Sequence, residues 1–176
     1  MTNGTASDSA LIERDGITTG GIAPIGGMDP TNEERRQILC GQHAHLRETI
    51  HVAQVAARNL LTSRGPVGDL QAGVNALNQE LLLHLADEER LLTPILTKVD
   101  AWGPVRAGLL QAEHAHQRAI LAVLTGPTAW PAATLVAGRT LSLCDDLLTD
   151  MEFEEREFMN EKLLRDDLIL LDASDA

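Results

Sequence analysis

LNQELLLHLADEERLLTPIL, residues 77–96, places His84 and Glu88 four residues apart with no proline between them. In a helix, residues four apart lie one turn apart on the same face. Followed in both directions, this face alternates steps of four and three residues, which is typical of the buried side of a bundle helix. Its members are Leu70, Val74, Leu77, Leu81, His84, Glu88, Leu91 and Ile95. The pattern therefore predicts a buried helix in which an imidazole and a carboxylate stand where leucines are expected.

A carboxylate on a buried helix face needs a partner, because removing it from water costs several kcal/mol. A metal cation would satisfy Glu88 and His84 together. If other segments of the chain also direct metal-ligating side chains inward, the buried polar layer is best interpreted as a metal site.

The composition favours one all-α domain. The chain has 176 residues, of which 44% are hydrophobic and only 2% are aromatic, and it contains no tyrosine. The core must therefore be built from leucine, alanine, valine and isoleucine, and such a composition favours helices over sheets.

The net charge of −12 argues against nucleic acid and against anionic membranes as partners, and it suits a soluble protein that holds cations. No apolar run approaches the ~20 residues that span a bilayer, and the first residues lack the basic and apolar regions of a signal peptide. Cys40 and Cys144 are too few for a disulfide scaffold, and we expect two buried thiols in a reducing compartment. We therefore expect a cytoplasmic protein that is a monomer or a small homo-oligomer.

The chain divides into three parts: a flexible N-terminal arm at residues 1–30, a helical bundle at 31–165 and an acidic C-terminal tail at 166–176. Within the bundle, periodicity and helix breakers predict four helices: residues 32–62, 67 to 97 or 98, 105–125 and 131–164. Thr31 and Glu34 fit a capping box at the first start, and Pro94 is expected to kink the second helix or to end it a turn early.

The other three helices also direct metal-ligating side chains inward. On their alternating faces lie His43 in the first helix, His114 in the third, and Asp150 and Glu154 in the fourth. Three further histidines fall off these faces and are expected at the surface: His45, His51 and His116. Glu89 and Glu155, which directly follow Glu88 and Glu154, are expected in solvent, although a small rotation of the fourth helix would make Glu155 the ligand.

An antiparallel up-down-up-down bundle brings the inward polar residues to about one level, at ~1.5 Å of rise per residue. The expected layer holds three imidazoles and three carboxylates: His43, His84, His114, Glu88, Asp150 and Glu154. By the same count, the inward residues of the third and fourth helices lie ~12 Å apart along the bundle axis. They reach one level only if residues 126–130 span this distance or if the fourth helix begins near Thr134.

Such a layer suits two metals bridged by Glu88 and Glu154, or one metal with spare carboxylates. Nitrogen and oxygen ligands without thiolate favour iron or manganese, with zinc as an alternative.

With these residues the chain resembles the hemerythrin-like (HHE cation-binding) family, over about residues 32–164. The family pattern is one inward His on the first helix, His-x-x-x-Glu on the second, Glu-His on the third and His-x-x-x-Glu on the fourth. The corresponding segments here are HAHLR (43–47), HLADEERLL (84–92), AEHAHQR (112–118) and DMEFEEREF (150–158). The resemblance implies a non-haem site with two irons and bridging carboxylates, which binds oxygen, nitric oxide or peroxide for carriage, storage or sensing.

The sequence departs from this pattern on one half of the site. Asp150 stands in the place of an imidazole, and Gln111 and Arg118 occupy positions where the family often has a second histidine on the third helix. An ion pair of Arg118 with Asp150 or with Glu113 is an alternative interpretation, in which Asp150 is not a ligand.

We therefore expect the metal held by His43 and His84 to be retained. The metal held by His114 and Asp150 is expected to be weaker, differently charged or absent. More carboxylate ligation stabilises the oxidised metal, which would shift the behaviour from reversible oxygen carriage toward peroxide chemistry or simple cation binding.

Three classes of function fit these observations. The first is a hemerythrin-like protein that binds or senses a small diatomic or peroxide ligand. The second is a di-iron oxidase, peroxidase or oxygenase, which a tunnel of leucine and alanine beside the site would favour; the sequence leaves open whether the protein is an enzyme. The third is an interaction bundle whose site is degenerate, single-metal or empty.

Overall fold

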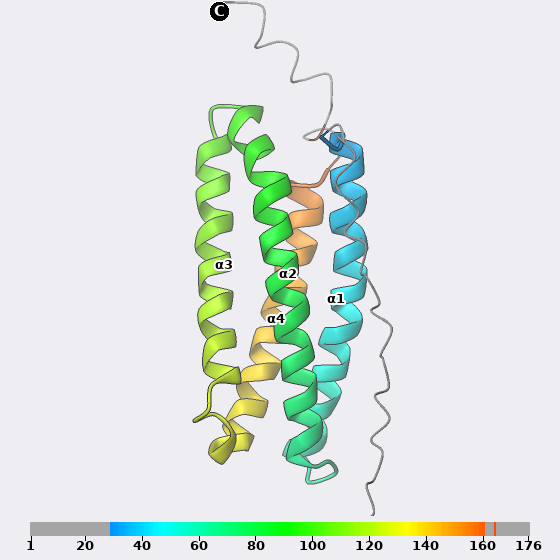
Figure 1. Cartoon of the computed structure of the whole chain (residues 1–176), viewed down its shortest axis with the longest axis vertical. Helices are drawn as coiled ribbons and strands as arrows, with labels where there is room; N and C mark the ends of the chain where they lie inside the picture. Colours follow the sequence, from blue (N-terminus) through cyan, green and yellow to red (C-terminus); the bar gives the residue numbers. More distant parts are fainter. Residues whose placement is uncertain (1–28, 161–163, 165–176) are drawn as a thin grey trace, which may run out of the picture.

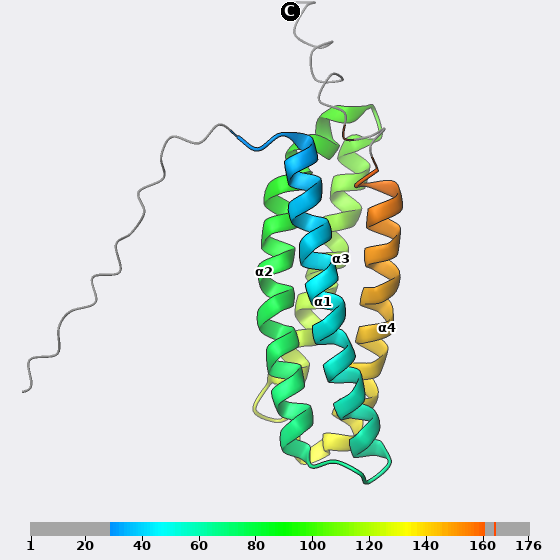
Figure 2. The ribbon, with the colours of Figure 1, turned by 90° about the vertical axis from the view of Figure 1, so that its right-hand side faces the viewer.

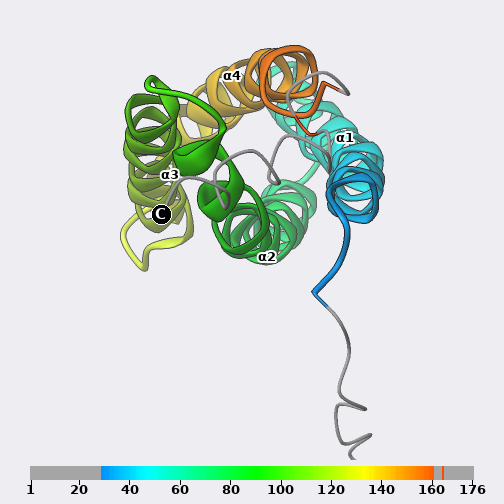
Figure 3. The same cartoon turned by 90° about the horizontal axis from the view of Figure 1, so that it is seen from above.

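A computed structural model describes residues 29–160 and Leu164, and these form an antiparallel four-helix bundle with up-down-up-down topology (Figures 1 and 2). Its elements are α1 (Asn32–Leu61), α2 (Val67–Val99), α3 (Gly103–Thr125), the short 3₁₀ helix η1 (Trp130–Ala132) and α4 (Ala133–Glu157). Seen from the end, the four helices surround a common interior (Figure 3). The predicted all-α fold is confirmed. The predicted arm, except Asp29 and Pro30, and the predicted tail lie outside the described residues.

The first helix begins where the capping box predicts. The Glu34 backbone N–H donates to Thr31 Oγ1 at 3.2 Å, and the Thr31 N–H donates to Glu34 Oε2 at 2.8 Å. The second helix does not end early at Pro94, because α2 continues through it to Val99, one residue beyond the expected end.

The third helix begins two residues earlier than expected, at Gly103. A Cβ atom at Gly103 would collide with the carbonyl oxygen of Leu96, so only glycine allows α2 and α3 to approach this closely at their shared corner.

The fourth helix is shorter than the predicted 131–164, because Pro131 belongs to η1 and α4 ends at Glu157. At that end the Asn160 side chain donates to the carbonyl oxygens of Arg156 and Glu157, which satisfies acceptors that a continuing helix would have used. Figure 1 shows the α3–α4 connection descending past the end of α3 before α4 begins, so the connection absorbs the difference in level.

The inward residues named from the sequence are buried, apart from Asp150, which is half-buried. The buried apolar residues form two clusters. The larger one includes Leu46, Leu81 and Leu147, and the smaller one includes Leu39, Leu91 and Leu110. The polar residues of the inward faces lie between these clusters, so apolar packing on both sides holds the polar layer in place.

No single described helix is long and apolar enough to cross a membrane. One bent pair among the described helices is long and apolar enough when its two parts are counted together: α3 and the segment from η1 through α4, which meet at an angle of 89°.

Candidate metal centre

Three histidines from three helices point into the polar layer. His43 of α1 and His114 of α3 are fully buried, and His84 of α2 is 5% exposed. In each of them the Nε2 atom lies close to a buried carboxylate, while the Nδ1 atom faces a polar side chain of a neighbouring helix. All three imidazoles therefore present the same nitrogen to the interior.

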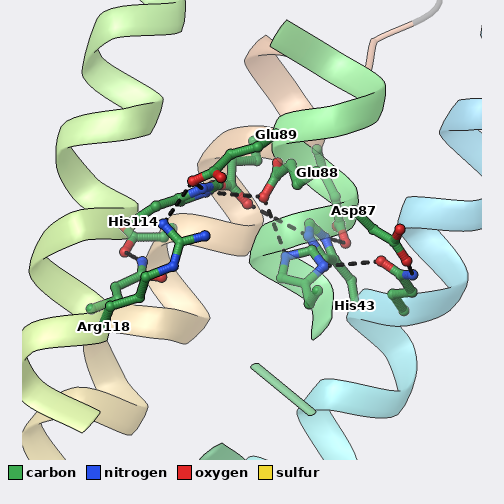
Figure 4. Close-up of polar contacts among 12 residues, drawn as sticks. His43, Asp87, Glu88, Glu89, His114 and Arg118 are labelled. Atoms are coloured by element: carbon green, nitrogen blue, oxygen red, sulfur yellow. Dashed lines mark hydrogen bonds and ion pairs between the residues drawn. The ribbon is translucent and has the colours of Figure 1, made fainter. Parts of the chain in front are cut away.

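Glu88 is the central carboxylate of this layer and is fully buried. Its Oε2 atom lies 3.3 Å from His84 Nε2 and 3.3 Å from His114 Nε2 (Figure 4). Glu154 reaches in from α4, where its Oε2 atom lies 3.5 Å from His43 Nε2.

Four buried residues come together closely enough to share one cation. Ligand atoms of His43, His84, Glu88 and Glu154 all lie within 4.8 Å of one another. Two neutral imidazoles and two carboxylates are a donor set that suits iron, manganese or zinc.

The inward polar atoms of this layer are not satisfied by other protein groups. The buried side-chain atoms that lack a hydrogen-bond partner within the described part of the chain include His43 Nε2, His114 Nε2 and both carboxylate oxygens of Glu88. Buried polar atoms are almost always paired, because leaving one unpaired costs about 1–3 kcal/mol. The donor set therefore fits a bound metal, which would satisfy these atoms together.

The two predicted halves of the site differ in how they assemble. His114 contacts Glu88 but does not belong to the cluster of four, and Asp150 is only half-buried. Asp150 Oδ2 accepts a hydrogen bond from Gln117 Nε2 at 3.0 Å. The half built on His43 and His84 is thus compact, whereas the half built on His114 and Asp150 is more open.

Arg118 pairs with neither of the partners considered from the sequence. Its guanidinium donates to Glu89 Oε1 at 2.7 Å (Figure 4). The alternative in which Arg118 neutralises Asp150 or Glu113 is therefore wrong, and Asp150 has Gln117 as its partner instead.

Glu155 and Glu89 were expected in solvent, but both contact ligand histidines. Glu155 Oε1 lies 2.9 Å from His43 Nδ1, and Glu89 Oε1 lies 3.0 Å from His114 Nδ1. Glu154 is the inner carboxylate on α4, with a side chain 8% exposed, whereas the Glu155 side chain is 34% exposed. The rotation of α4 that would exchange their roles does not occur.

The Nδ1 atom of His84 faces a neutral acceptor instead of a carboxylate. Its Nδ1 atom lies 3.2 Å from Gln42 Oε1, and Gln42 Nε2 donates to Asp87 Oδ2 at 2.7 Å (Figure 4). Because the Gln42 amide nitrogen faces a carboxylate, its oxygen is the atom that faces the imidazole.

The sequence contains a signal for these outer contacts. The motif His-Ala-His-x-Arg occurs at residues 43–47 and again at 114–118, and Glu-Glu-Arg occurs at 33–35, 88–90 and 154–156, of which the last two include inner glutamates. The bundle places the first motif on α1 and α3 and the two Glu-Glu-Arg motifs with an inner glutamate on α2 and α4, so equivalent residues meet in two equivalent pairs of helices.

The two inner carboxylates carry different charges. Burial alone would raise the pKa of Glu88, but the imidazoles of His114 and His84 outweigh burial and lower that pKa to about 2. Burial and the negative charge of Glu88 raise the pKa of Glu154 to about 9. Burial also lowers the pKa of His43. At neutral pH the metal-free site therefore holds an ionised Glu88, a protonated Glu154 and a neutral His43.

A small cavity adjoins the layer on the side of Asp150. It is bounded by polar and apolar side chains and has a volume of about 10 Å³. The polar members of its wall are His84, Gln117, Asp150 and Glu154; the apolar ones are Leu46, Leu81, Leu85, Leu147 and Met151. This volume is about enough for one water molecule.

A larger groove of about 350 Å³ lies between α3 and α4, lined by residues that include Ile120, Val123 and Arg139. None of the six predicted ligands contributes to its wall within the described chain.

The remaining sequence expectations concern histidines and thiols away from the layer. As predicted, His45, His51 and His116 are exposed. Cys144 is buried, but Cys40 is only half-buried, so the expectation of two buried thiols holds for Cys144 alone. Burial raises the pKa of both thiols, to about 12 for Cys144.

One family model matches the chain: the model described as Hemerythrin HHE cation binding domain covers residues 36–161. This range contains every residue of the polar layer described above. The comparisons with curated proteins and with solved structures gave no match.

Proposed function

We propose that this chain, which belongs to the hemerythrin HHE cation-binding domain family, binds iron in its polar layer and uses it to bind or sense oxygen, nitric oxide or peroxide. The observation that carries the proposal is the convergence of three imidazole Nε2 atoms, from three helices, on the buried carboxylates of Glu88 and Glu154. Both oxygens of Glu88 lack a hydrogen-bond partner in the described chain. A bound iron would supply an open position at which a small ligand can attach.

The primary metal position is proposed at His43, His84, Glu88 and Glu154, which already lie within 4.8 Å of one another. A second position is proposed between His114 and Asp150, sharing Glu88 and Glu154 as bridges. We expect it to be weaker because Asp150 is half-buried and hydrogen-bonded to Gln117. Manganese or zinc in place of iron remains compatible with these donors.

A small exogenous ligand is favoured over an organic substrate by the cavity beside His84, Asp150 and Glu154. Its volume of about 10 Å³ accommodates about one water molecule, so it suits a ligand of two or three atoms. An oxidase or oxygenase that acts on an organic substrate would need a larger space next to the metal. A binding or sensing role therefore has better support than such an enzyme.

The proposal is tested by the metal content of the purified full-length protein and by its absorption spectrum before and after exposure to air and to azide. We expect one to two irons per chain and charge-transfer bands that change on azide addition. His84→Ala should reduce bound iron by at least about tenfold, because it removes an inner ligand.

The matched control is His116→Ala, which removes an exposed histidine of α3 and should leave the metal content unchanged. Wild-type protein that takes up neither iron, manganese nor zinc would refute the proposal and would favour an interaction bundle with a degenerate site. Equal losses of iron in both histidine variants would also refute the assignment of the site.

A further inference from the structure

Arg47, Glu155 and His43 form a triad that joins α1 to α4. The Arg47 guanidinium donates to Glu155 Oε1 at 2.9 Å, and the same oxygen lies 2.9 Å from His43 Nδ1. Because a carboxylate oxygen only accepts, the His43 Nδ1 atom must carry the proton of a neutral imidazole. The Nε2 atom is then left with a bare lone pair that faces the interior.

A second triad with the same connections joins α3 to α2. Arg118 donates to Glu89 Oε1 at 2.7 Å, and that oxygen lies 3.0 Å from His114 Nδ1 (Figure 4). The arginine follows the histidine by four residues in both triads, and the glutamate directly follows an inner glutamate. Two occurrences of one arrangement, in different pairs of helices, argue for a shared purpose rather than a chance surface contact.

The arginines are what keep the outer carboxylates in place. The side chains of Glu155 and Glu89 are 34% and 32% exposed, so without a partner each could turn toward water. Bound by Arg47 and Arg118 respectively, each carboxylate is held against an imidazole nitrogen by charge-assisted hydrogen bonds.

We propose that Arg47 and Arg118 are positioning residues, which act through Glu155 and Glu89 to hold the Nδ1–H groups of His43 and His114 outward and to aim their Nε2 atoms at the polar layer, where a cation can bind them. Outer carboxylates that accept from a ligand histidine set its tautomer and orientation and typically change metal affinity 10–100-fold. The effect on metal rests on the proposed function, whereas the effect on the histidine tautomers does not.

The first test measures the tautomers directly. Long-range ¹H–¹⁵N NMR of the full-length protein at pH 8, after treatment with a chelator, should show His43 and His114 protonated at Nδ1. Glu155→Gln should give a mixture of tautomers at His43 alone, and Glu89→Gln should do so at His114 alone. Both substitutions preserve side-chain shape, and a thermal melt checks that the variants remain folded.

The second test measures affinity for Fe(II) under anaerobic conditions. Arg47→Met and Glu155→Gln should each weaken the primary position about 10–100-fold, with partial rescue in Arg47→Lys, which keeps the charge. The matched control is Arg106→Met, because Arg106 makes a comparable ion pair with Asp100 at 2.9 Å in the α2–α3 corner, away from the polar layer. Arg106→Met should change neither the histidine tautomers nor the affinity for Fe(II).

Unchanged tautomers in both glutamine variants would overturn the proposal, as would equal losses of affinity in Arg47→Met and Arg106→Met. If the tautomers respond as expected while wild-type protein binds no metal, the triads stand and the proposed function fails.

Discussion

At the scale of single residues, the two buried carboxyl groups of Glu88 and Glu154 together hold one proton, which lies on Glu154. Glu88 is ionised because two imidazoles approach it within 3.3 Å, and Glu154 stays protonated because burial and the charge of Glu88 oppose its ionisation. Metal binding supplies positive charge that removes this opposition, so it should release the Glu154 proton.

This charge distribution predicts how the stability of the metal-free protein depends on pH. Glu154 has a pKa of about 9 in the folded chain, above its ordinary value of 4.5, so the folded state binds more protons between these values. The free energy of unfolding should therefore fall as pH rises through this window, by at most about 1.4 kcal/mol per pH unit from this group. Urea unfolding with a chelator at pH 5.5 and 8.5 measures the slope.

Glu154→Gln should remove the contribution of Glu154 to the fall in the free energy of unfolding with pH. It should also make the metal-free protein more stable at pH 8.5, because an amide does not ionise. Glu152→Gln is the matched control, since Glu152 is an exposed residue of the same helix. A Glu154→Gln variant with the pH slope of the wild type would contradict the assignment of a buried, protonated Glu154.

At the scale of the helices, the corner between α2 and α3 depends on the absence of a side chain. A Cβ atom at Gly103 would meet the backbone of Leu96, and backbone atoms cannot move aside as a flexible side chain can. Gly103→Ala should therefore lower the free energy of unfolding by about 1–3 kcal/mol, the usual cost of overpacking.

Chemical denaturation of Gly103→Ala checks this value, with Gly108→Ala as the matched control. Gly108 lies on α3 with open space around its Cβ position, so alanine there should be neutral or stabilising. Equal stability of the two variants would show that the α2–α3 corner does not require glycine.

At the scale of the whole molecule, the polar layer draws its donors from all four helices, and only the folded chain brings them together. A metal that binds this layer stabilises the folded state by about 2.7 kcal/mol at a free concentration of 100 Kd. For a chain of this size that corresponds to a rise in Tm of roughly 5–10 °C.

Thermal melts with and without Fe(II) or Mn(II) measure this rise, and in His84→Ala it should be strongly reduced. A rise of the same size in that variant would show that the metal binds elsewhere on this acidic chain, whose net charge is −12.

The sequence by itself determined which helix faces are buried and which polar residues lie on them. Periodicity suffices for this, because the 3.6-residue turn carries every third or fourth side chain to the same side. His43, His84, Glu88, His114 and Glu154 were identified in this way, and all are buried. The end of α4 was less predictable, because the side chain that caps it, Asn160, lies beyond the helix and leaves no periodic signal.

Only the tertiary structure decided which residues meet across helices. Periodicity places Glu89, Glu155 and the two triad arginines at the edge of a helix face, where solvent and a neighbouring helix are equally compatible with the pattern. Their contacts depend on how α1 packs against α4 and how α2 packs against α3, and the spacing of residues along one helix does not give this. The packing of α3 against α4 gives Asp150 a partner in Gln117 rather than Arg118, because distances between helices are set by the fold as a whole and not by local spacing.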